Sequence, residues 1–249
     1  MKKIFTLILN KFNLRRSNLF KNPILIYTMG KVGSSMIERQ LPNAYHCHTL
    51  YGNPPCPPYL IFKFGKVINF IRKLAVYPLK RIILRNRKKL KIVTLYRDPL
   101  TRNPSMMFQD LHFWIADYLL SKPNFNRESN STMLLDIFKD TFPHNYPETW
   151  VRDELSRFTK VPERELYLGQ QNYKIITKNN LTLFVGKVEA LGEYIEVLEQ
   201  FVDNELKLTP ANVGKNKWYA SIYDELKSPL IEISLTRVSN KFRELNGYK

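Results

Sequence analysis

The amino-acid sequence predicts an α/β fold built on a central parallel sheet. Three short apolar runs, at residues 23–28, 91–96 and 181–185, are expected to be buried strands because they are continuous rather than alternating. Stretches with helical spacing of apolar residues follow these runs. Strands that alternate with helices form parallel sheets. Since no internal repeat or linker divides the chain, we expect residues 1–249 to form a single domain.

The first part of the chain is expected to hold two strands on either side of a helix. In order, the elements are a strand at 23–28, a glycine loop at 29–35, a helix at 36–41, a strand at 45–50 and a proline-rich loop at 53–58. Ser34 or Ser35 is the expected N-cap of the helix, because serine hydroxyls accept hydrogen bonds from the first free N–H groups. Pro42 ends this helix.

The remainder of the chain is predicted to be mostly helical. After the strand at 91–96, we expect helices from Thr101 or Pro104 to residue 120, at 132–140 and at 148–159, a small strand or hairpin at 166–176, a strand at 181–185, a helix at 189–205, a polar loop at 212–216, and helices at 217–227 and 229–245. Pro229 separates the last two, since proline interrupts helices.

Positive charge is concentrated in the first third of the chain. The formal net charge is +17, and residues 1–91 hold nineteen Lys and Arg against one acid, Glu38. Residues 92–249 are nearly balanced, with twenty basic and twenty-one acidic residues. The excess lies in a basic N-terminal segment at 1–21 and a basic helical insertion at 59–90. Such a pattern indicates an anionic partner: nucleic acid, anionic lipid, or a phosphate- or sulfate-bearing molecule.

The N-terminal sequence and the cysteines bear on location. The apolar run at residues 4–9 is too short to span a membrane, and no small-residue cleavage site follows it. Cys47 and Cys56 do not form a disulfide framework, so a reducing compartment is expected. We predict a cytoplasmic protein, with peripheral association with the inner membrane face as the alternative for its basic segments.

The loop after the first strand has the features of an anion-binding site. It reads Gly-Lys-Val-Gly-Ser-Ser at residues 30–35. Glycines let backbone N–H groups turn toward an oxyanion, and the helix that follows adds free N–H groups and its dipole. The spacing is not G-x-x-x-x-G-K-[ST], and G-x-G-x-x-G is absent, so a nucleoside triphosphatase and a dinucleotide-binding fold are both disfavoured. The alternative is an ordinary strand–helix turn that happens to contain a lysine.

A second motif follows the strand at 91–96. Arg97 comes at the strand's carboxyl end, where ligands bind in open α/β sheets, and Ser105 follows eight positions later. A guanidinium fork and a hydroxyl suit a terminal phosphate. The alternative is that Arg97 pairs with Asp98 or Asp110 and that Ser105 caps a helix.

Together the two motifs resemble sulfotransferases that use 3′-phosphoadenosine-5′-phosphosulfate (PAPS). Residues 212–220, Asn-Val-Gly-Lys-Asn-Lys-Trp-Tyr-Ala, are similar to the block of the NKWYS family of capsular polysaccharide synthesis proteins, although Ala220 replaces the final serine. Residues 144–150 and the strand before residues 189–191 are similar to that family too. The resemblance covers about residues 22–227 and is weakest at 51–90. It implies a P-loop-like three-layer sandwich of the sulfotransferase type.

The resemblance also implies roles for particular residues. Those of the 5′-phosphosulfate loop are Gly30, Lys31, Val32, Gly33, Ser34 and Ser35, and those of the 3′-phosphate site are Arg97 and Ser105. Lys215 and Lys217 match a late basic loop over the nucleotide. The implied reaction transfers a sulfuryl group from PAPS, a co-substrate, to a hydroxyl or amine of a polysaccharide or glycolipid in capsule or cell-envelope synthesis. No metal is expected to take part.

A general base is expected near the sulfur, and three residues are candidates. His46 and His48 lie on one face of the strand at 45–50, and Cys47 lies on the other. His48 is favoured because it is nearer the strand's end, His46 is next, and Glu38 is third. A metal site of His46, Cys47 and His48 is disfavoured because the alternation splits the ligands. The alternative is that both histidines are structural.

Two other functions compete with sulfuryl transfer. A different nucleotide- or phosphate-binding transferase, such as a kinase, lacks its usual lysine and an acidic pair for magnesium here. A non-enzymatic membrane- or nucleic-acid-binding protein would account for the basic segment at 59–91. It would not account for Arg97, Ser105 and the glycine loop, so nucleic acid is the less favoured partner.

Overall fold

The computed structural model describes residues 24–41, 44–51, 83–85, 90–121, 130–178, 180–207 and 217–248. The basic segment at 1–21, most of the insertion at 59–90, and the polar loop at 212–216 with Lys215 lie outside the described residues. Five strands form one sheet in the described part of the chain: β1 (Ile24–Tyr27), β2 (Tyr45–Cys47), β3 (Lys91–Tyr96), β4 (Tyr173–Lys178) and β5 (Leu181–Lys187).

The sheet confirms the predicted α/β class and its mostly parallel pairing. The strand order is β2-β1-β3-β5-β4. All neighbours are parallel except β4 and β5, which pair antiparallel with Lys178 opposite Leu181. That pairing leaves a two-residue turn, and Asn180 in it has a φ of 59°, as tight hairpins require. The side chains of β1 and β3 are buried, except for Lys91, because helices pack on the sheet.

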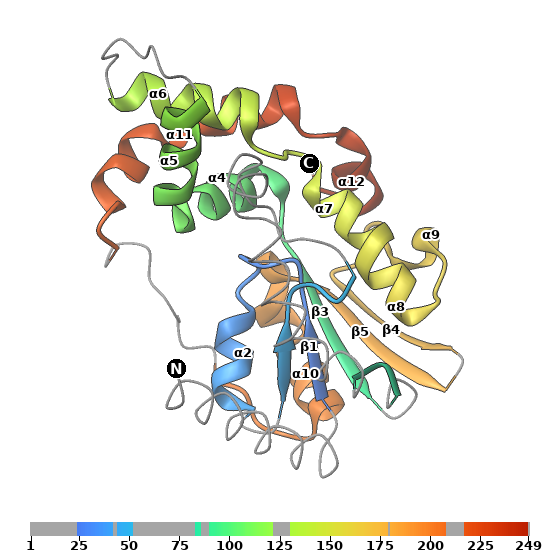
Figure 1. Ribbon diagram of the computed structural model, residues 1–249. Coiled ribbons are helices and arrows are strands. Elements are labelled where there is room, and N and C mark those ends of the chain that lie inside the picture. Colours follow the sequence, from blue (N-terminus) through green and yellow to red (C-terminus); the bar gives the residue numbers. More distant parts are fainter. Residues whose placement is uncertain are drawn as a thin grey trace, which may run out of the picture.

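Helices lie against the sheet and beyond the carboxyl ends of its parallel strands. In chain order, the helices of the described residues are α2 (Ser34–Gln40), α4 (Pro99–Gln109), α5 (Leu111–Ser121), α6 (Asn130–Asp136), η2 (Ile137–Thr141), α7 (Tyr146–Trp150), η3 (Val151–Ser156), α8 (Arg157–Thr159), α9 (Glu163–Leu166), η4 (Val188–Glu193), α10 (Ile195–Val202), α11 (Ala220–Arg237) and α12 (Asn240–Leu245). Figure 1 shows α2 and α10 beside the strands, whereas α4, α5, α6 and α11 gather beyond the strands' carboxyl ends. No helix among the described residues is long and apolar enough to cross a membrane.

Two hydrophobic cores correspond to this arrangement. One lies around the sheet and includes Leu25, Ile92 and Phe184. The second is formed by α4, α5, α6 and α11, with Phe108 and Trp114 among its buried side chains. The carboxyl ends of the strands therefore face a separately packed helical layer.

Several predicted boundaries were wrong. The helix expected up to residue 120 is two helices, broken at Asp110. The second strand ends at Cys47 rather than at residue 50. The expected break at Pro229 does not occur, and α11 runs through it to Arg237. Leu226 and Leu230, on either side of this proline, are both buried in the second core, and that packing overrides the local preference.

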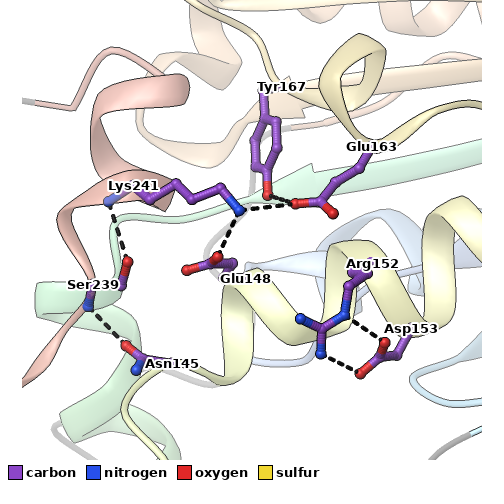
Figure 2. A network of polar contacts seen from close by, with 8 residues as sticks. All are labelled: Asn145, Glu148, Arg152, Asp153, Glu163, Tyr167, Ser239 and Lys241. Atoms are coloured by element: carbon purple, nitrogen blue, oxygen red, sulfur yellow. Dashed lines mark hydrogen bonds and ion pairs between the residues drawn. The ribbon is translucent and has the colours of Figure 1, made fainter.

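A polar network connects the C-terminal helix α12 to helices α7 and α9 (Figure 2). Lys241 Nζ lies 2.8 Å from Glu148 Oε1 and 3.6 Å from Glu163 Oε1. The Ser239 N–H donates to Asn145 Oδ1 at 2.7 Å. Arg152 is exposed and pairs only locally, with the adjacent Asp153. This pair supplies a surface arginine for comparison with the buried ones described below.

Candidate functional site

The candidate site lies between β1 and β3, where the connections of the chain turn to opposite sides of the sheet. The chain passes from β1 through α2 to β2 on one side of β1, and from β3 through β4 to β5, which both lie on the other side of β3. The carboxyl ends of the neighbouring strands β1 and β3 therefore diverge into separate connections. Ligands of open α/β sheets bind in the crevice at such a switch point. The glycine loop follows β1 and Arg97 follows β3, so both predicted motifs lie at this crevice.

The loop after β1 has an unusual backbone conformation. Gly30, Lys31 and Gly33 have φ values of 84°, 59° and 73°. Glycine adopts this left-handed region without strain, but a lysine there is uncommon. A Cβ atom at Gly33 would also lie 2.9 Å from Val188 Cγ2, so glycine is needed on both counts. Strained residues of this kind cluster at functional sites.

Two arginines hold the carbonyl groups of this loop. Arg102 donates to the oxygens of Met29, from Nη2 at 3.0 Å, and of Gly30, from Nε at 3.3 Å. Arg97 Nη1 donates to the oxygen of Lys31 at 3.2 Å. In a trans peptide the N–H points opposite to the C=O. The N–H groups of these three successive peptide units therefore face away from the arginines, as in an anion-binding nest.

The remaining loop residues complete this arrangement. Among the described residues, none accepts a hydrogen bond from the N–H groups of residues 30–35. The Val32 side chain is fully buried and anchors the loop, so only its backbone is available to a ligand. The predicted serine cap was wrong: Gly33 is the N-cap, and Ser34 and Ser35 are the first residues of α2. With no side chain over the helix start, the first N–H groups of α2 stay free.

Arg102 is a central residue that the sequence analysis missed. Its side chain is fully buried, and it also donates to Asn103 Oδ1 at 2.9 Å and lies 4.9 Å from the centre of the Tyr146 ring. Burial lowers the pKa of Arg102 to about 10. No carboxylate pairs with this guanidinium in the described part of the chain. The only sequence signal was its place in the helix that follows Arg97.

Arg97 is directed toward the loop rather than toward an acid. Its Nε donates to Thr101 Oγ1 at 3.1 Å. Asp98 is bound instead by Arg243, whose Nε is 3.2 Å from Asp98 Oδ1. The alternative in which Arg97 pairs with Asp98 is therefore excluded. Ser105 is half-buried on α4, one helical turn beyond Thr101 and so on the same face.

Other cationic side chains lie near Lys31. Burial, together with the nearby charges of Arg97 and Lys217, lowers the pKa of Lys31. Burial raises the pKa of Asp110, although Lys31 opposes this effect. Lys217 and Trp218 come just before α11 and are both exposed, Trp218 at 69%. The crevice thus has two adjacent positive positions, the N–H nest and the side-chain cluster, which suit a ligand with two anionic groups.

His48 lies beside the loop, and its Nε2 has no hydrogen-bond partner in the described part of the chain. A Cβ on Gly30 would be 3.8 Å from His48 Nδ1, so the ring packs against the loop. Nδ1 lies 2.9 Å from the Thr28 carbonyl oxygen, which can only accept, so Nδ1 carries the proton. Desolvation of the ring where it packs on the loop, together with the neighbouring His46, lowers the pKa of His48. The exposed ring is therefore neutral, with Nε2 available to accept a proton.

His46 is engaged at both nitrogens. Its Nδ1 lies 2.7 Å from Glu38 Oε2 and its Nε2 lies 3.1 Å from Ser34 Oγ. Ser34 is buried, and its hydroxyl also accepts a hydrogen bond from Thr28 at 3.3 Å. The rings of His46 and His48 are in edge contact at 4.6 Å, which confirms that they share one face. Of the two histidines, only His48 therefore keeps a ring nitrogen without a partner among the described residues.

Comparisons of the chain with protein families, with curated proteins and with solved structures give no match.

Proposed function

We propose that this protein is a PAPS-dependent sulfotransferase with a P-loop-like three-layer fold of the sulfotransferase type. The observation that carries the proposal is the pair of arginines that hold three successive loop carbonyls, so that the N–H groups form a nest at the switch point. The acceptor, a hydroxyl or amine of a capsule or cell-envelope polysaccharide or glycolipid, rests on the sequence resemblance alone.

The proposed reaction assigns a task to each part of the crevice. The loop N–H groups and Lys31 bind the 5′-phosphosulfate, while Arg97 and Ser105 bind the 3′-phosphate. The bond between sulfur and the bridging oxygen breaks, and that oxygen keeps the electron pair. Lys31 and the N–H groups stabilise its charge by fixed electrostatics. The acceptor oxygen forms the new bond to sulfur, and its proton passes to His48 Nε2.

The transfer rate should depend on the protonation of His48. The base must be neutral, and its pKa lies below the ordinary histidine value of 6.5. We therefore expect kcat to stay constant down to about pH 6.5 and to fall in more acidic solution. The His48→Ala variant should lose about 100-fold in kcat and lose this acidic limb. A variant with the wild-type rate and limb would contradict the role of His48.

The product nucleotide 3′-phosphoadenosine-5′-phosphate offers a direct test of the site. At about 100 times its Kd it should stabilise the protein by about 2.7 kcal/mol, a rise of several degrees in Tm. ATP, which lacks a 3′-phosphate, should stabilise it much less. The Arg97→Ala variant should bind the bisphosphate about 10-fold to 100-fold more weakly, because a charge-assisted hydrogen bond is lost. The exposed Arg152→Ala variant is the matched control. Equal stabilisation by ATP and the bisphosphate would refute the proposal.

A serine hydrolase is a second candidate, favoured by the chain Ser34–His46–Glu38. Its two distances, 3.1 Å and 2.7 Å, match a nucleophile, a base and an orienting acid. However, Ser34 is only 4% exposed, and its hydroxyl also accepts from Thr28. Because a nucleophile must reach its substrate, we place this function second. Covalent labelling of Ser34 by a fluorophosphonate probe would favour it over sulfuryl transfer.

A further inference from the structure

A continuous chain of hydrogen bonds joins the candidate base to a surface carboxylate. From Glu38, it passes through His46 and Ser34 to Thr28 Oγ1, at 2.7, 3.1 and 3.3 Å. Thr28 Oγ1 in turn lies 3.4 Å from His48 Nδ1. These residues come from α2, from β2 and the residue after it, and from the start of the glycine loop, so the chain exists only in the folded protein.

The chemistry of its acceptors fixes the direction of this chain. The Glu38 carboxylate can only accept, so His46 Nδ1 carries a proton, and the Thr28 carbonyl imposes the same on His48. In neutral rings both Nε2 atoms are then acceptors. The Ser34 hydroxyl therefore donates to His46, and Thr28 donates to Ser34. From His48 to Glu38, each side chain thus donates its hydrogen bond to the next side chain toward Glu38.

Burial isolates the middle of the chain from water. Thr28 is fully buried and Ser34 is 4% exposed, whereas the Glu38 side chain is 40% exposed and His48 is exposed. Hydrogen bonds are stronger in such a dry interior and polarise one another. The charge state at the Glu38 end can therefore influence the His48 end, even though Glu38 and His48 do not touch.

We propose that Glu38, His46, Ser34 and Thr28 are positioning residues that hold His48 in the tautomer with Nε2 free, and that stabilise its positive charge after it accepts a proton. The proposal deepens the proposed function, in which His48 is the base. The charged and titratable groups around His48 are His46, Glu38 and Arg102. Of these, only Glu38 is negative, and the hydrogen-bond chain connects it to His48.

Histidine NMR of the free protein tests the chain without any enzyme assay. We expect the ¹⁵N shifts of His46 and His48 to report neutral rings protonated at Nδ1 at pH 7. Glu38→Gln replaces the acceptor by an amide that can donate, so it should change the tautomer of His46 and the ring ¹⁵N shifts of both His46 and His48. A His46 or His48 ring protonated at Nε2 in the wild-type protein would overturn the proposal.

A double-mutant cycle separates the chain from effects through space. Thr28→Val keeps the shape of the buried side chain but removes the hydroxyl. In the Thr28→Val background, Glu38→Gln should no longer change the ring ¹⁵N shifts of His48, although the loss of the Glu38 charge still acts through space. If the change persists undiminished, the chain does not carry it and the proposal fails.

Activity and binding give a readout that separates this proposal from the proposed function. Thr28→Val and Glu38→Gln should lower kcat about tenfold and move the acidic limb of the pH profile, while bisphosphate binding stays unchanged. Wild-type kcat and pH profile in both variants would assign the chain a structural role only. Absence of bisphosphate binding in the wild-type protein would refute the sulfotransferase instead, and the NMR cycle would still decide on the chain. Fluorophosphonate labelling of Ser34 would show a nucleophile and overturn the positioning role.

Discussion

Removal of the Lys31 ammonium group should slow sulfuryl transfer by about 100-fold or more, since this is the typical cost of losing one preorganised donor to developing charge. In the free protein, burial and the charges of Arg97 and Lys217 lower the pKa of Lys31. A bound anion would oppose these effects and stabilise the ammonium form. The measurement is kcat for transfer from PAPS under single-turnover conditions.

Two variants at this position separate charge from backbone strain. Lys31 has a φ of 59°, so Lys31→Ala keeps a side chain in the left-handed region while Lys31→Gly relieves it. Both should lose the same factor in rate, although the glycine variant has no backbone strain there. Lys227→Ala, at an exposed position on α11, is the control. Full activity in Lys31→Gly would remove Lys31 from the proposed mechanism.

Replacement of Arg102 should have the largest effect on stability. Arg102→Leu leaves the carbonyl oxygens of Met29 and Gly30 without their donor, and buried unsatisfied groups cost about 1–3 kcal/mol each. We expect a loss of about 3 kcal/mol or more in the free energy of unfolding, from denaturant titration. Bisphosphate binding should also be lost, because the loop N–H groups would no longer be held in one direction.

Arg102→Lys is the conservative variant for this experiment, and Arg152→Leu is its surface control. Arg102→Lys keeps the charge but cannot make both contacts of the planar guanidinium, so it should fold and still bind the bisphosphate weakly. Arg152 is exposed and contacts only Asp153, so Arg152→Leu should change the stability by less than about 0.5 kcal/mol. Wild-type binding by Arg102→Lys would show that the carbonyl contacts do not organise the site.

The strands and the glycine loop could be predicted because their signals are local. The apolar runs of β1, β3 and β5 are continuous, and the glycines stand where the backbone takes positive φ values. Arg97 could also be placed at the crevice, because the end of a parallel strand fixes its position. The resemblance to a known family also named residues at this crevice.

The parts that could not be predicted depend on contacts between distant segments. An arginine inside a helix is ordinarily exposed, and nothing near Arg102 in the sequence indicates complete burial. The hydroxyl of Ser34 was expected to face a ligand, yet His46 and Thr28 occupy it. The preference for His48 over His46 rested only on its position in the strand until their partners were known. Only the tertiary structure distinguishes a histidine with both nitrogens engaged from one with a free Nε2.

The division into two hydrophobic cores has a consequence for how the molecule opens. The glycine loop belongs to the sheet core, whereas Met107 and Phe108, on the helix that carries Arg102, belong to the helical core. The crevice therefore lies at the boundary between the two hydrophobic cores, and the segments packed around each core could exchange their amide hydrogens independently of the other. A ligand that binds both sides of this boundary would join them into one cooperative unit. Slower exchange in α5 and α6 would then accompany binding, although neither helix needs to touch the nucleotide.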